Sequence, residues 1–329
     1  MEDNPSKPAL TVIRGLSKVE KRAIQKSTEI ALDPPTEISF QHTILCQTSL
    51  PYRDPGDHVR EWDRRCGFAH LLLEAGSALD PRQNKYVKLG LPFGPKPRLI
   101  LCYLNTEALK TGSPIIDVQD TLTSFVKRIQ DPSGKGKNAT PNGREIKAFK
   151  VHLSRLSVAK ITLGMVNENA RANQVNSHFV EAVEDFDLWF PKNENQRVLW
   201  PSTIQLNDRY FKSLAKHAVP LDERALCALA HSAMALDIYS WLAQRLHRID
   251  PNKNGGEGEF VAWFNLKEQF GQGYGRMTDF RGAFLKTLEQ VWQQYRAANF
   301  EVDKEKGIYL KNSKPPVPKR LYQVIRKIE

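Results

Sequence analysis

The strongest constraint on this 329-residue chain is an order of elements that occurs twice along it. Each time, the hydrophobic pattern predicts a helix, a short strand, a short helix, a turn, a long helix and a β-hairpin. The first copy is expected at residues 97–112, 115–118, 120–129, 140–157 and, as the hairpin, 160–166 with 178–183. The second copy is expected at 222–248, 260–264, 265–271, 278–299 and 300–302 with 308–310. The copies share this pattern rather than residue identity, and they predict two similar domains in tandem.

Residue types at the ends of these segments support the expected boundaries. Thr140 followed by Pro141 is a helix-start signal, because threonine caps a helix and proline suits its first position. The glycine-rich stretch 251–258 predicts a turn. Upstream of the first copy, the apolar residues of 62–75 follow helical spacing, which predicts a further helix that ends at Gly76.

The repeated order is that of a winged helix, a helix-turn-helix with an attached β-hairpin. We therefore predict an α+β fold that is mainly α and contains two tandem winged-helix domains. The polar, proline-punctuated N-terminal residues predict a mobile or loosely docked arm, in which the mixed-charge stretch 18–26 can form a short helix. The expected joint between the domains is 191–197. The expected division is an N-terminal arm at 1–50, a first domain at 51–190, a second domain at 191–313 and a basic C-terminal tail at 314–329.

The charge balance favours a polyanionic partner. The sequence has 48 Lys and Arg against 37 Asp and Glu, a formal net charge of +11, which attracts nucleic acid or anionic membrane. No run approaches the roughly 18–20 apolar residues that span a bilayer, so no membrane partner is expected. The acidic residues that follow Met1 lack the apolar stretch of a secretory signal, and the expected location is cytoplasmic.

No arrangement of residues indicates catalysis. The 4 cysteines lie far apart without CxxC spacing, and the 8 histidines show no metal-type spacing. The glycine-rich stretches 133–137 and 271–276 lack the context and the pattern of nucleotide-binding loops, and we interpret them as turns before long helices. We therefore expect no metal, no cofactor and no enzymatic activity.

The long helix of the first copy has two chemically different faces at about 100° per residue. Its apolar face carries Ile146, Phe149, Leu153 and Leu156. The other face offers cationic groups to phosphates and guanine edges. A solvated basic face is the alternative for an isolated helix, whereas the third place in a winged-helix order favours DNA contact. With two lysines of the preceding loop, the predicted DNA-binding residues are Lys135, Lys137, Arg144, Lys147, Lys150, Ser154 and Arg155.

The long helix of the second copy has a similar division. The residues expected in its core face are Phe280, Phe284, Leu288, Val291 and Tyr295. On the opposite face, glutamines can read adenine, and Gly282 allows close approach to a DNA strand. Asp279 and Glu289 on the same face oppose phosphate contact. The N-terminal end of a recognition helix most often meets base edges, and the predicted DNA-binding residues are Arg276, Arg281, Lys286, Gln290 and Gln293.

Several stretches resemble the RepA-type initiators of broad-host-range plasmids. They are 47–53 (QTSLPYR), 89–98 (LGLPFGPKPR), 235–243 (ALDIYSWLA) and 284–288, and the likeness runs from about 47 to 317. The stretch 235–243 is similar to the long first helix of the second winged-helix domain in such initiators. The resemblance implies an origin-binding protein that recognises repeated sites (iterons), opens an AT-rich region and recruits host helicase and initiator proteins. Some relatives repress their own gene as dimers, so the resemblance leaves both a monomer and a homodimer open.

The leading hypothesis is therefore a plasmid replication initiator that binds and bends double-stranded DNA. Its two long helices would enter successive major grooves, roughly 34–36 Å apart, so that a single copy spans a direct repeat. The alternative is a transcriptional repressor with the same domains and no direct replication role, because the DNA-contacting chemistry of the two is the same. A third class, a nickase or recombinase, would need a catalytic cluster that the residue spacing does not show.

Overall fold

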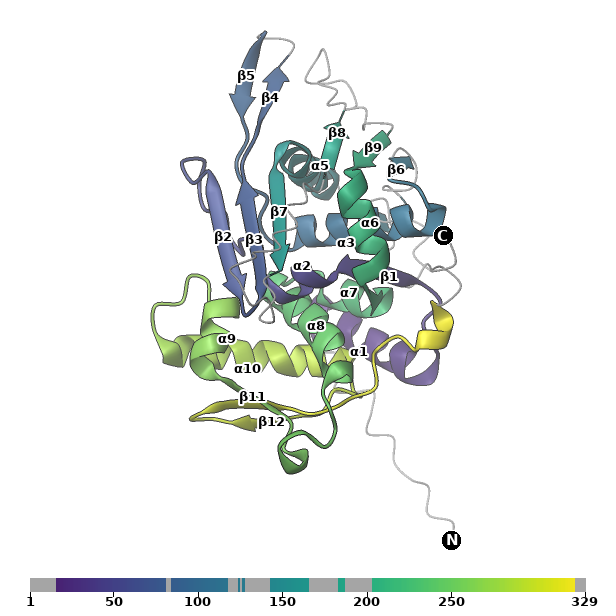
Figure 1. The fold of residues 1–329 in the computed structure, drawn as a ribbon, viewed down its shortest axis with the longest axis vertical. Helices are drawn as coiled ribbons and strands as arrows, with labels where there is room; N and C mark the ends of the chain where they lie inside the picture. Colours follow the sequence, from purple (N-terminus) through teal and green to yellow (C-terminus); the bar gives the residue numbers. More distant parts are fainter. Residues whose placement is uncertain are drawn as a thin grey trace, which may run out of the picture.

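The computed structural model describes residues 16–80, 84–117, 124, 126–127, 143–165, 183–186 and 203–322, which form a mixed arrangement of helices and open sheets (Figure 1). The described helices are α1 (Lys18–Leu32), α2 (Thr43–Gln47), α3 (Pro95–Thr111), α5 (Gly143–Val158), α6 (Asp208–His217), α7 (Glu223–Leu229), α8 (Ala233–Arg245), α9 (Trp263–Phe270) and α10 (Met277–Gln294). The described strands are β1 (Ile38–His42), β2 (Glu61–Cys66), β3 (Ala69–Glu74), β4 (Ser77–Asp80), β5 (Lys85–Lys88), β6 (Ile115–Asp117), β7 (Lys160–Met165), β8 (Val183–Phe186), β9 (Thr203–Leu206), β10 (Ala218–Asp222), β11 (Glu259–Ala262), β12 (Phe300–Asp303) and β13 (Gly307–Leu310).

Two three-stranded antiparallel sheets repeat one strand order. In the first repeated unit β6 pairs with β9 and β9 with β8, and in the second unit β11 pairs with β13 and β13 with β12. In each sheet the first strand therefore lies beside the third, and the second strand is at an edge. A long helix, α5 or α10, lies in the chain between the first and second strands of each sheet. The repeated order predicted from the sequence thus has a counterpart in the sheet topology.

The second half follows the predicted elements closely. Strands β12 and β13 form the expected hairpin, and β11 and α9 lie at the expected places. The single helix predicted at 222–248 is wrong, because the chain turns after α7 and a new helix begins. Ser232 caps that helix, α8, by accepting a hydrogen bond from the backbone N–H of Ala235. Helix α10 ends at Gln294, before the predicted end at 299.

The first repeated unit follows the prediction less closely, because the sequence pattern predicts the wrong partner for strand β7. Helix α3 and strand β6 confirm two predicted elements, and Gly112 ends α3 in the left-handed region at φ 67°. The predicted hairpin of 160–166 with 178–183 is wrong at its described ends, because β7 pairs with β3 and Val183 begins β8, which pairs with β9. The short helix predicted at 120–129 is described only at 124, 126 and 127, which are helical. The predicted loop 131–138, the start of the helix at 140–142 and the predicted joint 191–197 lie outside the described residues.

Residues 61–74 form a β-hairpin where a helix was predicted. Strands β2 and β3 pair along their full length, and Gly67 between them has a φ of 56°. Burial alternates along β3, with Leu71 and Leu73 fully buried, because successive side chains of a strand point to opposite faces. Strands β4 and β5 form a second hairpin that projects beyond the body (Figure 1). The helix prediction for 62–75 is therefore wrong.

Residues 16–50 belong to the folded body rather than to a mobile arm. Strand β1 pairs with β10 along its length, which ties the N-terminal segment to the second half of the chain. Phe40, Ile44 and Leu50 are buried in the core. The predicted arm at 1–50 is therefore wrong for its described part, and residues 1–15 lie outside the described residues.

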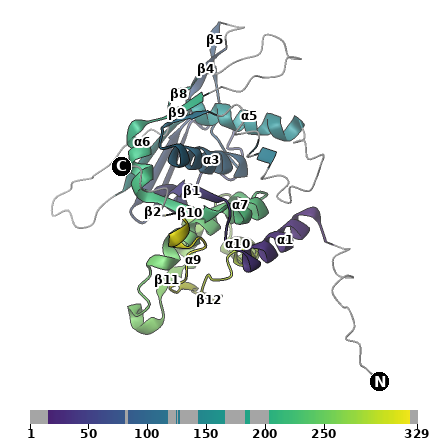
Figure 2. The same ribbon diagram turned by 90° about the vertical axis from the view of Figure 1, so that its right-hand side faces the viewer.

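One core of buried apolar side chains includes residues of both halves. Helix α3 lies next to α5 in the upper part of the molecule, and α8 and α10 lie below them (Figures 1 and 2). In the part of the chain that the structure describes, no helix combines the length and the apolar character needed to span a membrane.

Candidate nucleic-acid interface

Helix α5 presents one face to the core and the other to solvent. Its buried side chains include Phe149, Leu153 and Leu156, as predicted, and α3 packs along this side of the helix (Figure 2). On the outer side Arg144 and Lys147 are exposed, and Val151 is 43% exposed. The cationic outer face expected from the sequence is therefore open to solvent over the N-terminal part of α5. The side chain of Ile146 lies outside the described part of the chain.

The body of the protein holds Arg155, near the C-terminal end of α5. Its Nη1 donates to the backbone oxygen of Leu91 at 3.0 Å and lies 3.8 Å from the Asp54 carboxylate. Its guanidinium also lies over the Phe93 ring, 5.1 Å from the ring centre. The sequence predicts that Arg155 contacts DNA. To do so, its side chain would have to give up these partners.

Two other predicted residues of α5 are half-buried. Burial lowers the pKa of Lys150. The backbone oxygen of Ser154 accepts a hydrogen bond from Ser157 Oγ at 2.7 Å. Lys135 and Lys137 lie outside the described residues. The open cationic groups of α5 thus come from its N-terminal part.

Helix α10 is fixed by an aromatic core. The ring of Phe284 packs against three other rings, with centres 5.9 Å from Trp263, 5.6 Å from Phe270 and 5.5 Å from Phe280. All four side chains are buried, as are Leu288, Val291 and Tyr295. The core face predicted for this helix is therefore confirmed.

The N-terminal half of α10 is open to solvent. The Arg276 side chain is 81% exposed, and its Nε lies 2.9 Å from the Asp279 carboxylate. A Cβ placed on Gly282 would meet no atom within 4 Å, so this position allows close approach of another molecule. Arg281 Nη1 donates to the backbone oxygen of Lys304 at 2.7 Å, which ties α10 to the turn between β12 and β13. The start of the helix and this turn thus form one surface.

The C-terminal half of α10 has a neighbour that the sequence did not indicate. Helix α1 packs against it, with Ser27 Oγ donating to the backbone oxygen of Gln293 at 2.7 Å and Gln294 Nε2 donating to that of Ala23 at 3.0 Å. The two helices enclose a cleft of about 290 Å³. Three of the predicted DNA-binding residues line this cleft: Lys286, Gln290 and Gln293.

A local sequence signal marks the start of α1. Ser17 and Glu20 form a capping box, in which each side chain accepts a hydrogen bond from the backbone N–H of the other residue. The signal agrees with the short helix expected at 18–26 within the predicted arm, and the observed helix is longer, Lys18–Leu32. The packing of that helix on α10, however, joins residues far apart in the chain, and no local pattern reports it.

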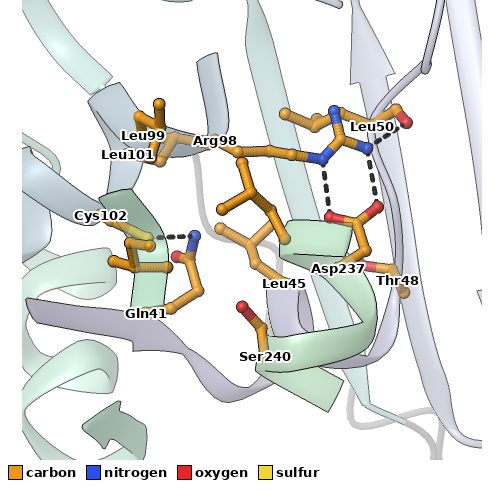
Figure 3. Close-up of a pocket in the computed structure, with 12 residues that line it drawn as sticks. Gln41, Leu45, Thr48, Leu50, Arg98, Leu99, Leu101, Cys102, Asp237 and Ser240 are labelled. Carbon is orange, nitrogen blue, oxygen red and sulfur yellow. Dashed lines mark hydrogen bonds and ion pairs between the residues drawn. The ribbon is translucent and has the colours of Figure 1, made fainter. Parts of the chain in front are cut away.

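A buried ion pair joins the two halves, and sequence reasoning missed it. Arg98 of α3 and Asp237 of α8 are 5% and 7% exposed. Arg98 Nε lies 2.6 Å from Asp237 Oδ1, and Nη2 lies 2.8 Å from Oδ2, so the contact is bidentate (Figure 3). Both residues fall within stretches that carry the family resemblance, but neither charge has a partner nearby in the sequence.

Among the described residues, no group of three or more His, Cys, Asp or Glu side chains has the arrangement of a metal site. His152 packs edge-on against Phe93, with ring centres 4.8 Å apart, and burial lowers its pKa to about 4.

These features define a basic protein of two similar helix-and-sheet units, each with a long helix that has an outward cationic end. The model of a family described as "Plasmid encoded RepA protein" matches residues 91–265, more than half of the chain. The protein belongs to this family of plasmid-encoded RepA proteins, which confirms the resemblance found in the sequence.

Two solved structures are similar over most of the chain. One is a crystal structure of RctB domains 2–3, with 11% identity, coverage of 80% of this chain and 85% of that chain, and a TM-score of 0.40. Another is a selenomethionine derivative of domains 2 and 3 of RctB, with 12% identity, coverage of 75% and 83%, and a TM-score of 0.42. No curated protein matches the chain.

Proposed function

We propose that the protein is a plasmid replication initiator that binds double-stranded DNA sequence-specifically through two tandem winged helices. The observation that carries the proposal is the repeated strand order, β6-β9-β8 and β11-β13-β12, with a long helix before the second strand each time. A winged helix has this arrangement, with its recognition helix before the hairpin. Membership of the plasmid-encoded RepA family supports the replication role.

The proposed domains follow the sheets. Strand β9 completes the first sheet, so the first winged helix extends to Leu206, past the joint predicted at 191–197. The second begins with α8 and ends with β13. The segment from α6 to α7 connects the two, and β10 within it pairs with β1.

The proposed DNA contacts are the open ends of α5 and α10. In the first domain Arg144 and Lys147 contact phosphates or guanine edges, and Lys135 and Lys137 of the preceding segment add phosphate contacts. In the second domain the corresponding surface is the start of α10 and the turn between β12 and β13. Lys286, Gln290 and Gln293 lie beside α1, so they reach DNA only along the edge of that helix.

The remaining parts of the proposal concern partners. The protein recognises repeated origin sites, helps to open the origin and recruits host helicase and initiator proteins in the cytoplasm. It needs no cofactor and catalyses no reaction, because binding and bending of DNA are sufficient for this role. A homodimer is a second form in which the same surfaces can act, for example in repression of its own gene.

The proposal is tested with the double variant Arg144→Ala/Lys147→Ala. Both side chains are exposed, so the fold should be unchanged by circular dichroism. Each lost phosphate contact should lower the slope of log affinity against log salt by about 0.9, so the double variant should lose about 1.8. A charge-matched control is Lys212→Ala/Lys216→Ala, which removes two exposed lysines from α6 and should leave the slope unchanged. Equal slopes for the wild type and the α5 variant would overturn the assignment of α5.

The replication role needs a separate assay. A plasmid that carries only the gene and its flanking repeats should be maintained in a suitable host, and the α5 variant should lose this maintenance. If the protein binds the repeats but the wild-type plasmid is not maintained, the repressor hypothesis replaces the initiator.

A further inference from the structure

The junction between the two halves is built around one guanidinium group. Besides its bidentate contact with Asp237, Arg98 donates to three backbone oxygens. Nη2 reaches Leu50 at 2.7 Å (Figure 3). Nη1 reaches Gly94 at 2.7 Å and Pro51 at 3.3 Å. The guanidinium therefore links α3, α8 and the segment after α2 at a single point.

The pair lies in a mostly apolar environment. The surrounding pocket is lined by leucines of α2, α3, α7 and α8, among them Leu45, Leu99 and Leu236. Removing two charges from water costs free energy that their mutual attraction only partly returns, and well-packed hydrophobic residues in the same place are often as stable. Net stability is therefore a poor explanation for a buried ion pair at this junction.

The ion pair provides a directional contact, which the apolar contacts around it do not. The hydrophobic effect is non-directional, so apolar burial by itself specifies the mutual orientation of two helices less strictly than a directional contact does. A bidentate arginine–carboxylate contact holds two groups in one plane and one register. Here the two groups are on α3 and α8, the helices that begin the two repeated units. Arg98 is the fourth residue of α3 and Asp237 the fifth of α8, so the pair joins nearly equivalent positions of the two copies.

We propose that Arg98 and Asp237 are positioning residues that set the placement of one winged helix relative to the other. Through this placement they determine the spacing between the two DNA half-sites that the protein accepts. This inference rests on the proposed function, because spacing has a meaning only if α5 and α10 both read DNA. The helices are held in advance for one spacing, so little binding free energy is used to order them.

The experiment uses selection from a library of random-sequence duplexes with the full-length chain. Wild-type protein should enrich duplexes that carry two motifs at one spacing, about tenfold over the neighbouring spacings. The variant Arg98→Met/Asp237→Leu replaces the pair with hydrophobic residues and leaves no charge unpaired. It should enrich the same two motifs, while the preference for one spacing falls to about threefold or less.

A purely structural role gives a different result. A variant that only loses stability recovers less DNA but keeps the same distribution of spacings. Leu214→Ala, a cavity in the buried face of α6, is the matched control for this effect. If the Met/Leu variant recovers the wild-type distribution of spacings, the inference is overturned.

Arg98→Lys is the second variant, for use if the double variant does not fold. It keeps the positive charge but loses the bidentate geometry, so it should broaden the spacing distribution, and an unchanged distribution again overturns the inference. A failure of the proposed function is distinguishable, because the wild type would then enrich no paired motif at all.

Discussion

Acid should destabilise this protein through a histidine that caps a helix from inside the core. His42 is 2% exposed and lies at the start of α2, where its Nδ1 accepts a hydrogen bond from the backbone N–H of Ile44 at 3.2 Å. Its Nε2 lies 3.1 Å from Ser213 Oγ, and its ring stacks on Tyr210 with centres 5.5 Å apart. Burial lowers the pKa of His42 to about 3. A proton on Nδ1 would remove the acceptor that caps α2.

The sign and the size of the effect follow from linkage. The pKa of His42 is about 3 in the folded protein and about 6.5 in the unfolded chain, so the unfolded state binds more protons as the pH falls below 6.5. Stability is therefore complete above pH 6.5 and is lost on acidification towards pH 3. At about 1.36 kcal/mol per pKa unit, the loss from pH 7 to pH 5 is about 2 kcal/mol. His152, with a pKa of about 4, adds a similar amount, about 2 kcal/mol.

Urea denaturation followed by tryptophan fluorescence at pH 7, 6 and 5 measures this loss. Between pH 7 and pH 5 the two histidines should together remove about 4 kcal/mol of unfolding free energy from the wild type. His42→Asn keeps a residue that caps helices well but does not titrate, so its loss should be about 2 kcal/mol smaller than that of the wild type. If the two proteins show the same pH dependence, the assignment of the buried neutral state to His42 is refuted.

Three further changes test the packing and the interface. Phe284→Ala should lower the unfolding free energy by about 3–5 kcal/mol in urea denaturation, because a fully buried ring is lost; a loss below about 1 kcal/mol would contradict the aromatic core. Gly76→Ala should lower the melting temperature, since the new Cβ would lie 1.7 Å from a backbone oxygen at the end of α5, whereas Gly282→Ala, with no atom within 4 Å, should not. Gln290→Ala/Gln293→Ala should change DNA affinity by less than about threefold, because both side chains line the cleft beside α1; a loss as large as that of the α5 variant would show that they read bases.

The repeated order was predictable because it depends on local signals. The periodicity of α10 separates a core face from an outer face, and the hairpin that follows has a short polar turn between two strands with apolar residues. Proline at the start and glycine at the end mark α3 in the sequence as they do in the structure. Each of these signals acts over a few residues, so a single sequence is enough to read them.

The hairpin β2–β3 shows where local reading fails. Apolar residues at 62, 68, 71, 72 and 75 fit a helical period, but Leu71 and Leu73 also fit the alternation of a half-buried strand. The choice is made by tertiary structure, because β3 gains hydrogen bonds from β2 on one side and from β7 on the other. Strand β7 lies far from β3 in the chain, and the sequence pattern pairs β7 instead with the nearer segment 178–183. Alternation predicted the strand, but not its partner.

For the proposed DNA-binding residues, the sequence predicts the helix face on which each lies but not whether its side chain is accessible. Helical periodicity places Arg155 and Gln293 on the outer faces of α5 and α10, and both helices do have an outer face. The structure adds partners from elsewhere in the chain, the backbone oxygen of Leu91 for one and helix α1 for the other. A helical wheel describes one helix by itself, whereas occlusion depends on elements that are distant in the sequence.

The two occlusions have a common consequence for the proposed interface. The C-terminal part of α5 is held by the segment around Leu91, and Gly76 packs on the carbonyl group of its last residue, Val158. The C-terminal half of α10 is held by α1, which is not part of the repeat. Helices α5 and α10 are thus both covered at their C-terminal halves, but by different segments of the chain. In the part of the chain that the structure describes, no such segment covers the N-terminal halves, and a recognition helix most often meets base edges in a major groove with its N-terminal end.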